Sequence, residues 1–197
     1  MISIRGYSSQ IVKSFLDLLP PHEQISVLSR GGLSTKGERH LFCQGFLQPR
    51  SITVQTNEEI AKSFLVNAAD IIKQCELIFA SNDEARVCII GSESGFSGSF
   101  DASYAASKAA LHSYVETKKL RTSSQQIVCI APSIISDAGM TIRRNDLDNL
   151  KRKEASHPKG RFLYCSEVAK LIHFLLYVDE GYLCNIVIRM NGGQHVR

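Results

Sequence analysis

The chain alternates between short apolar runs and longer segments whose apolar residues recur at helical spacing. Six runs rich in Ile, Val, Leu and Cys have the length of buried strands, and they predict strands over residues 2–5, 25–29, 40–43, 86–90, 127–130 and 184–189. Apolar residues three and four apart predict helices over residues 9–19, 56–80, 103–120 and 166–178, with a further helix near 141–152. The run Thr56-Asn57-Glu58-Glu59 has the form of a capping box and marks the start of the second helix.

This alternation of strands and helices predicts one α/β domain over residues 1–197. Parallel strands need crossover connections, and the intervening helices supply them, so we expect a parallel sheet covered on both faces. Ligands in such folds bind outside the carboxyl ends of the strands. The informative loops are therefore those after Arg5, Cys43, Ile90 and Ile130.

The positive charge of the chain is concentrated in one segment. Residues 143–161 contain seven basic and three acidic residues, which equals the net charge of +4 of the whole chain. This pattern indicates either a solvated loop or a lid over an anionic ligand. One short basic block without interleaved aromatic residues is not typical of nucleic-acid binding.

The six cysteines indicate a reducing compartment. No Cys-x-x-Cys pair is present, so we expect no zinc site or other metal site, and several cysteines lie within apolar runs. A strand predicted from Ile2 leaves no room for a signal peptide, and no apolar run has membrane-spanning length. We therefore expect a cytoplasmic protein that neither enters a membrane nor binds nucleic acid.

Three residues carry the candidate chemistry. Tyr104 and Lys108 are four residues apart on a predicted helix and share one face. An ammonium group beside a phenol favours the phenolate and is expected to lower the phenol pKa, which suits a general acid or base. Ser92 follows the strand over 86–90, where its hydroxyl is expected to hold a substrate oxygen while Tyr104 transfers the proton.

These residues lie in a stretch that resembles the short-chain dehydrogenase/reductase family. The resemblance is carried by Gly91-Ser92-Glu93-Ser94-Gly95 and by Tyr104-Ala105-Ala106-Ser107-Lys108, and it continues through Ile130-Ala131-Pro132 and the last strand. It implies a Rossmann-like three-layer fold and a catalytic set of Ser92, Tyr104, Lys108 and Asn67, with Asn67 supporting a proton-relay water. It also implies a strand order of 2-1-3-4-5-6, because the segment after the second strand is too short for the outer strand of the family's sheet.

The same resemblance implies a dinucleotide site. Its predicted contacts are Gly6, Ser8, Ser9, Gln10, Ile11, Arg30, Gly45, Tyr104, Lys108 and Pro132. The family's nucleotide loop has three glycines, which allow close approach of the backbone to a pyrophosphate and of the helix to the strand. Here Gln10 and Val12 occupy two of the three places, so we expect weak binding. Lys13 and Arg30 suit the extra phosphate of NADP or are ordinary surface charges.

Three functions remain open from the sequence. The first is an NADP- or NAD-dependent oxidoreductase that acts on a carbonyl or hydroxyl of a small molecule, with an anionic substrate suggested by the basic segment. The second is a non-catalytic binding or regulatory relative that has lost efficient dinucleotide binding, and the third is an enzyme modifying a nucleotide-linked sugar. The family also implies a homodimer or homotetramer through helices 56–80 and 103–120. His112, one turn after Lys108, is expected to be structural or to lie at an interface.

Overall fold

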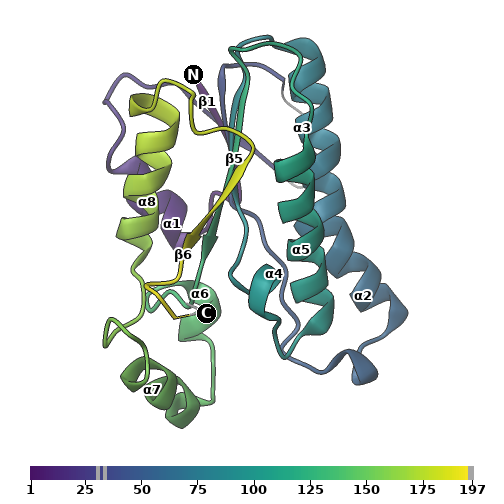
Figure 1. Ribbon diagram of the computed structural model, residues 1–197, viewed down its shortest axis with the longest axis vertical. Coiled ribbons are helices and arrows are strands. Elements are labelled where there is room, and N and C mark those ends of the chain that lie inside the picture. The colour runs from purple at the N-terminus through teal and green to yellow at the C-terminus, as the bar shows by residue number, and fades with distance from the viewer. Residues whose placement is uncertain (30–31, 33–34, 195–197) are drawn as a thin grey trace.

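Six parallel strands form a sheet in the computed structural model, which describes residues 1–29, 32 and 35–194 (Figure 1). The expected order 2-1-3-4-5-6 is confirmed, because the sheet runs β2-β1-β3-β4-β5-β6. Every neighbouring pair is parallel. The strands are β1 (Ile2–Arg5), β2 (Ile25–Leu28), β3 (Arg39–Phe42), β4 (Arg86–Ile90), β5 (Gln126–Pro132) and β6 (Ile186–Met190).

Helices cover both faces of this sheet (Figure 1). One layer contains α1 (Gln10–Leu16) and α8 (Cys165–His173), and the opposite layer contains α2 (Asn57–Phe64), α3 (Asp70–Ser81) and α5 (Ala102–Thr117). Three short helices lie toward the end of the sheet formed by the carboxyl ends of the strands: α4 (Ser94–Ser97), α6 (Gly139–Ile142) and α7 (Leu147–Ala155). The expected three-layer, Rossmann-like α/β fold is therefore confirmed.

Two apolar clusters join the layers, one on each face of the sheet. Ile2 and Ile4 of β1 pack with Ile11 and Phe15 of α1 in the first cluster, which α8 completes. The second cluster joins β4 and β5 to α3 and α5, with Ile71, Ile78, Val87, Leu111 and Ile127 all buried. Strands buried on both faces explain why the strand segments appear as continuous apolar runs in the sequence.

The helix boundaries differ from the expected ones in ways that have local causes. The first helix ends at Leu16 because the next amides, of Leu18 and Leu19, bond three residues back and tighten the chain before the prolines. The capping box at Thr56 is present as expected, but the long helix contains a π-helical turn, η2 (Leu65–Ala69). The helix expected near 141–152 divides into α6 and α7, and α8 ends in a second π turn, η3 (Phe174–Val178). The sequence pattern did not predict α4 or the 3-10 turn η1 (Ile52–Val54).

The segment between β2 and β3 is short, as expected. Among its described residues, 29, 32 and 35–38, none lies in a helix or strand. Arg30, predicted to contact the cofactor, lies outside the described residues. One consequence is an uncovered edge, because Ile25 and Val27 of β2 are 42% and 50% exposed.

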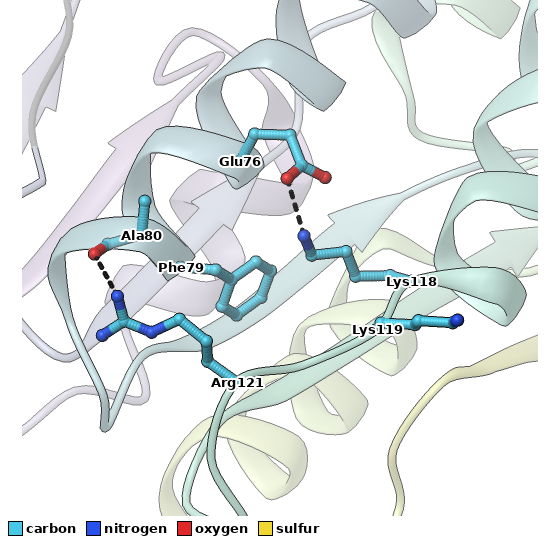
Figure 2. Close-up of a pocket in the computed structure, with 6 residues that line it drawn as sticks. All are labelled: Glu76, Phe79, Ala80, Lys118, Lys119 and Arg121. Atoms are coloured by element: carbon cyan, nitrogen blue, oxygen red, sulfur yellow. Dashed lines mark hydrogen bonds and ion pairs between the residues drawn. The ribbon is translucent and has the colours of Figure 1, made fainter.

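Side-chain contacts fasten the last turns of α3 to the chain that follows α5 (Figure 2). Lys118 Nζ lies 2.7 Å from Glu76 Oε2, and Arg121 Nη1 donates to the Ala80 carbonyl oxygen at 2.8 Å. Lys118 also lies over the Phe79 ring, 5.8 Å from its centroid. These contacts hold α3 and α5 side by side at the end of the sheet opposite to the carboxyl ends of the strands.

Candidate active site

The residues proposed for catalysis converge at the carboxyl end of the central strands. Ser92 follows β4 by two residues, and the preceding Gly91 amide donates to the Ile130 carbonyl oxygen of β5 at 2.7 Å. Tyr104 and Lys108 lie on the first two turns of α5, and both are buried. The side chain of Lys108 extends to the end of β4, where Nζ donates to the Ile90 carbonyl oxygen at 2.9 Å.

Ser92 lies close to Tyr104. The Ser92 hydroxyl is near enough to the Tyr104 phenol to lower its pKa. The Lys108 ammonium lies on the same side of the helix, 5.9 Å from the centre of the Tyr104 ring. The structure thus brings together three of the four predicted catalytic side chains in an arrangement suited to proton transfer.

The electrostatics of this group differ from the expected pattern. Burial raises the pKa of Tyr104; the nearby Ser92 hydroxyl opposes that rise, and the charge of Asp101 adds to it. Burial also lowers the pKa of Lys108 to about 8, with the neighbouring Cys129 and Cys43 acting in the opposite direction. The lowered phenol pKa expected from Lys108 is therefore not seen, because desolvation of the buried phenol dominates the shift. Tyr104 remains a neutral phenol near pH 7, ready to donate a proton.

Asp101 caps α5, the helix that carries Tyr104, and is a residue that the sequence pattern alone did not reveal. Its carboxylate caps α5 by accepting from the Tyr104 amide at 3.0 Å, and it also accepts from the Ser103 hydroxyl at 2.8 Å. The same carboxylate accepts from the Gln48 amide at 2.9 Å and the Gln55 side chain at 3.0 Å. Burial alone would raise the pKa of Asp101, but these hydrogen bonds outweigh it and lower the pKa. An Asp three residues before the Tyr is the N-cap signal that could have revealed this role.

Asn67 is the fourth predicted catalytic residue, and its side chain holds a loop. Its amide accepts from the Phe46 backbone N–H and donates to the Phe46 carbonyl oxygen, both at 2.8 Å. It also donates to the Ser63 hydroxyl at 3.2 Å. The side chain is fully buried and lies within the π turn η2, a local geometry often found at functional sites. The structure therefore ties Asn67 to the loop after β3 and does not bring its side chain to Tyr104.

The nucleotide loop keeps one feature of a dinucleotide site. Gly6 has φ of +79°, and a Cβ there would lie 2.5 Å from the Cys43 backbone carbon, so the loop after β1 approaches the loop after β3 closely. Ser9 caps α1 by accepting from the Ile11 amide at 3.3 Å, while Ser8 is exposed. Gln10 is exposed at the first position of α1.

Val12 occupies the third glycine position, where the family's glycine allows the helix to approach the strand. Its side chain is completely buried in the cluster shared with Ile4 and Phe15. Val12 therefore contributes to the core between α1 and the sheet, whereas Gln10 is the substitution that faces solvent at the loop.

The remaining residues predicted to contact the dinucleotide lie on β5, in the loop after β3 and on α1. Pro132, at the end of β5, is buried and its carbonyl oxygen accepts from the Glu93 amide at 2.9 Å. Gly45 is exposed, and a Cβ there would lie 3.1 Å from Met140 Cε, so α6 reaches the loop after β3. Lys13 is exposed on α1.

The basic segment forms α7 and its flanks. No residue of α7 is buried. Arg144 pairs with Asp146 and Arg161 with Glu167, while the described structure shows no ion pair for Lys151, Arg152 or Lys153. Among the described residues, no cluster of His, Cys, Asp and Glu could bind a metal ion, and no helix has both the length and the apolarity to cross a membrane.

No family model matched the sequence, and no curated protein matched it either. Solved structures do match the fold. A short-chain dehydrogenase/reductase described as glucose/ribitol dehydrogenase from Brucella melitensis superposes with a TM-score of 0.84 and 16% identity, covering 100% of this chain and 96% of that one. A short chain dehydrogenase family protein from Francisella tularensis subsp. tularensis SCHU S4 superposes with a TM-score of 0.82 and 18% identity, covering 98% of this chain and 97% of that one. An oxidoreductase of the short chain dehydrogenase/reductase family from Burkholderia thailandensis gives 0.81 and 13%, covering 98% and 91%.

The chain therefore has the fold of the short-chain dehydrogenases/reductases over its whole length. The similarity agrees with the resemblance of its Ser, Tyr and Lys motifs.

Proposed function

We propose that the chain is an oxidoreductase of the short-chain dehydrogenase/reductase type, which interconverts a carbonyl and a hydroxyl with NADP or NAD. The observation that supports this function most directly is that Ser92 and Lys108 both lie near the buried phenol of Tyr104. A neutral phenol near a serine hydroxyl and an ammonium group is an arrangement for donating a proton to a carbonyl oxygen.

Each residue has a distinct role in this proposal. The Ser92 hydroxyl donates a hydrogen bond to the substrate oxygen in place of the phenol, and Tyr104 passes its proton to that oxygen. Lys108 places a positive charge near the phenolate that remains, and the loop held by Asn67 supports the route by which Tyr104 is reprotonated. A bound nicotinamide supplies the hydride, so the proton from Tyr104 completes the reduction of a carbonyl to a hydroxyl.

The residues present fit the ribose end of a dinucleotide. The Lys108 ammonium has three N–H donors, and its bond to Ile90 uses one of them. Two donors on a buried cation favour a ligand with hydroxyl groups. Gly6 supplies the close backbone approach that the pyrophosphate needs. Ser8, Ser9, Gly45 and Pro132 are the further proposed contacts.

The adenosine end has less support from the chain. The segment from β2 to β3 is short, and Gln10 faces solvent where the phosphates would approach. We therefore propose weak binding, with NADP preferred over NAD because Lys13 is exposed near the loop and Arg30 follows β2. The unpaired basic side chains of α7 favour an anionic small-molecule substrate. The six free cysteines fit a reducing compartment such as the cytoplasm.

The exposed Gln10 also favours a second function, a binding or regulatory protein that has this fold but no turnover. A titration of the purified protein with NADPH and with NADH, followed by nucleotide fluorescence, separates the two. The proposed enzyme binds NADPH with a Kd in the micromolar to low millimolar range and binds NADH more weakly. Absence of binding of either nucleotide at millimolar concentration would favour the second function.

A further inference from the structure

The imidazole of His112 lies directly behind the loop that carries Ser92. His112 is on α5, one turn after Lys108 and two turns after Tyr104, so the three side chains form one stripe of the helix. Its side chain is almost completely buried, with 3% of the residue exposed. The first two residues of this stripe reach the candidate active site, and the third reaches the loop after β4.

The loop from Gly91 to Phe96 wraps around this imidazole. A Cβ on Gly91 would lie 2.6 Å from His112 Nε2, and a Cβ on Gly95 would lie 2.5 Å from His112 Cε1. The Phe96 ring stacks on the imidazole with the ring centres 4.6 Å apart and an angle of 29° between the planes. His112 thus occupies the space that a side chain at Gly95 would need, and it shares with Cys129 the space that one at Gly91 would need.

A polar contact joins the imidazole to the serine itself. The Ser92 backbone N–H donates to His112 Nε2 at 3.5 Å, the long end of the hydrogen-bond range. If Nε2 accepts this bond, the proton of the neutral ring is on Nδ1. Nδ1 has no hydrogen-bond partner among the described residues. The contact with the Ser92 amide therefore favours the tautomer with Nδ1 protonated.

Burial is the main reason that this ring is neutral. Burial, together with the Lys108 and Arg189 charges, lowers the pKa of His112 to about 4, while the Glu93 charge opposes them. A protonated ring would direct an N–H from Nε2 toward the Ser92 N–H. Neutrality is therefore a condition for the contact with Ser92.

The outer side of the same loop is held by a different element. Glu93 forms an ion pair with Arg189 of β6, and the Arg189 guanidinium lies 4.6 Å from the centre of the Phe96 ring. The Ser94 amide donates to Ser92 Oγ at 3.2 Å. The loop is consequently held by Arg189 of β6 and by His112 of α5, and the Ser92 hydroxyl oxygen accepts a hydrogen bond within the loop.

We propose that neutral His112 is a positioning residue, which sets the orientation of the Ser92 hydroxyl by accepting from the Ser92 amide and filling the space inside its loop. An effect of His112 on turnover rests on the proposed function. The tautomer of His112 and its contact with the Ser92 loop do not.

The test uses two substitutions of similar volume. His112→Leu fills the space but cannot accept a hydrogen bond, and His112→Gln offers a side-chain oxygen near the position of Nε2. His173→Leu is the matched control, because His173 lies on α8 and stacks on Tyr177, 5.2 Å between ring centres, away from Ser92. Circular dichroism establishes that each variant is folded, and if His112→Leu is not, the comparison is made between His112→Gln and wild type.

The first measurement needs neither cofactor nor substrate. Long-range 1H–15N correlation spectra of histidine-labelled wild-type protein are expected to show His112 as the Nδ1-protonated tautomer, with no titration between pH 5.5 and 9. The Ser92 amide resonance should shift in His112→Leu, remain close to wild type in His112→Gln and not move in His173→Leu. An Nε2-protonated ring, a titration near pH 6.5, or an unchanged Ser92 amide in His112→Leu would overturn the proposal.

The second measurement follows NADPH oxidation with a panel of aldehydes and ketones. In His112→Leu we expect kcat to fall roughly 10- to 100-fold, as for a misplaced catalytic group, with the Kd for NADPH unchanged. His112→Gln should recover a large part of the loss. Equal kcat in wild type and His112→Leu would refute the positioning role. A wild-type protein that turns over no substrate would refute the proposed function, and the spectra would then decide the role of His112 alone.

Discussion

The Lys108 ammonium is buried against the Ile90 carbonyl oxygen at a distance of 2.9 Å. Its residue is only 2% exposed, and burial lowers its pKa to about 8. A buried cation with one hydrogen bond to protein is costly to fold. Lys108 therefore destabilises the chain while placing donors where the proposed cofactor binds.

This cost gives a prediction about stability and pH. The pKa of Lys108 falls from 10.5 in the unfolded chain to about 8 in the folded one, so between these pH values the unfolded chain binds more protons. The loss of stability caused by burying the Lys108 ammonium is fully present below about pH 8 and disappears as pH rises toward 10.5. Lys108→Met should raise the free energy of unfolding at pH 7 by on the order of 2 kcal/mol in urea denaturation.

The comparison of Lys108→Met with wild type across pH isolates this effect. Burial raises the pKa of the thiols, for example that of Cys43 to about 11, so these groups lower the stability as pH rises. They do so equally in wild type and in Lys108→Met. The difference between the two curves should shrink from pH 8 to 10.5. Lys151→Met, on the exposed helix α7, is the control and should change stability by less than about 0.5 kcal/mol. A Lys108→Met protein less stable than wild type at pH 7 would contradict the prediction.

The nucleotide loop gives two substitutions with opposite expected effects. Gln10→Gly removes an exposed side chain from the start of α1 and should tighten NADPH binding several-fold. Val12→Gly opens a cavity in the core and places glycine inside a helix, so it should destabilise the fold by about 2–4 kcal/mol without improving binding. Nucleotide fluorescence and urea denaturation measure the two effects. Weaker NADPH binding in Gln10→Gly would show that its side chain is a ligand rather than an obstacle.

Asp101 is expected to support Tyr104 through the start of α5. Asp101→Ala removes the N-cap and the acceptor for Gln48 and Gln55, so unfolding should require about 2 kcal/mol less free energy. Asp146→Ala is the matched control, because Asp146 precedes α7 and is exposed with its Arg144 partner. Its substitution should cost less than about 0.5 kcal/mol. Equal losses of stability in Asp101→Ala and Asp146→Ala by chemical denaturation would show that the hydrogen bonds of Asp101 contribute no more than those of an exposed carboxylate.

The sheet and the catalytic motif were both accessible from the sequence, for separate physical reasons. Apolar runs such as Val87 to Ile90 must be buried on both faces, so their spacing predicted the strands. The strand order followed from the family resemblance together with the shortened segment after the second strand. The spacing of Tyr104 and Lys108 on one helix predicted their common face. The direction of the Tyr104 pKa shift could not be predicted from the sequence, because it depends on how deeply the folded chain buries the phenol. The pattern also did not reveal that the Val12 side chain is completely buried between α1 and the sheet whereas that of Gln10 faces solvent.

The proposed homodimer remains a prediction, and the structure suggests how to test it. The outer face of α5 is formed by small exposed residues, Ala102, Ala106, Ala109 and Ala110, and the neighbouring α2–α3 segment exposes Phe64, Leu65 and Leu77. We expect a dimer at 10–100 micromolar protein by light scattering (concentrations chosen for roughly micromolar association), and dissociation in Ala110→Arg but not in Ala155→Arg of α7. Dissociation in Val27→Lys instead would place the interface at the exposed β2 edge.

The central claim is that Tyr104 transfers the proton in a nucleotide-dependent reaction. Its most direct test compares wild type with Tyr104→Phe, which removes only the phenol oxygen, by measuring turnover of NADPH with a carbonyl panel and NADPH affinity in the same preparations. The account predicts that Tyr104→Phe loses at least about 100-fold in kcat, the scale of general acid catalysis, and binds NADPH as wild type does. Turnover in Tyr104→Phe equal to that of wild type would contradict it.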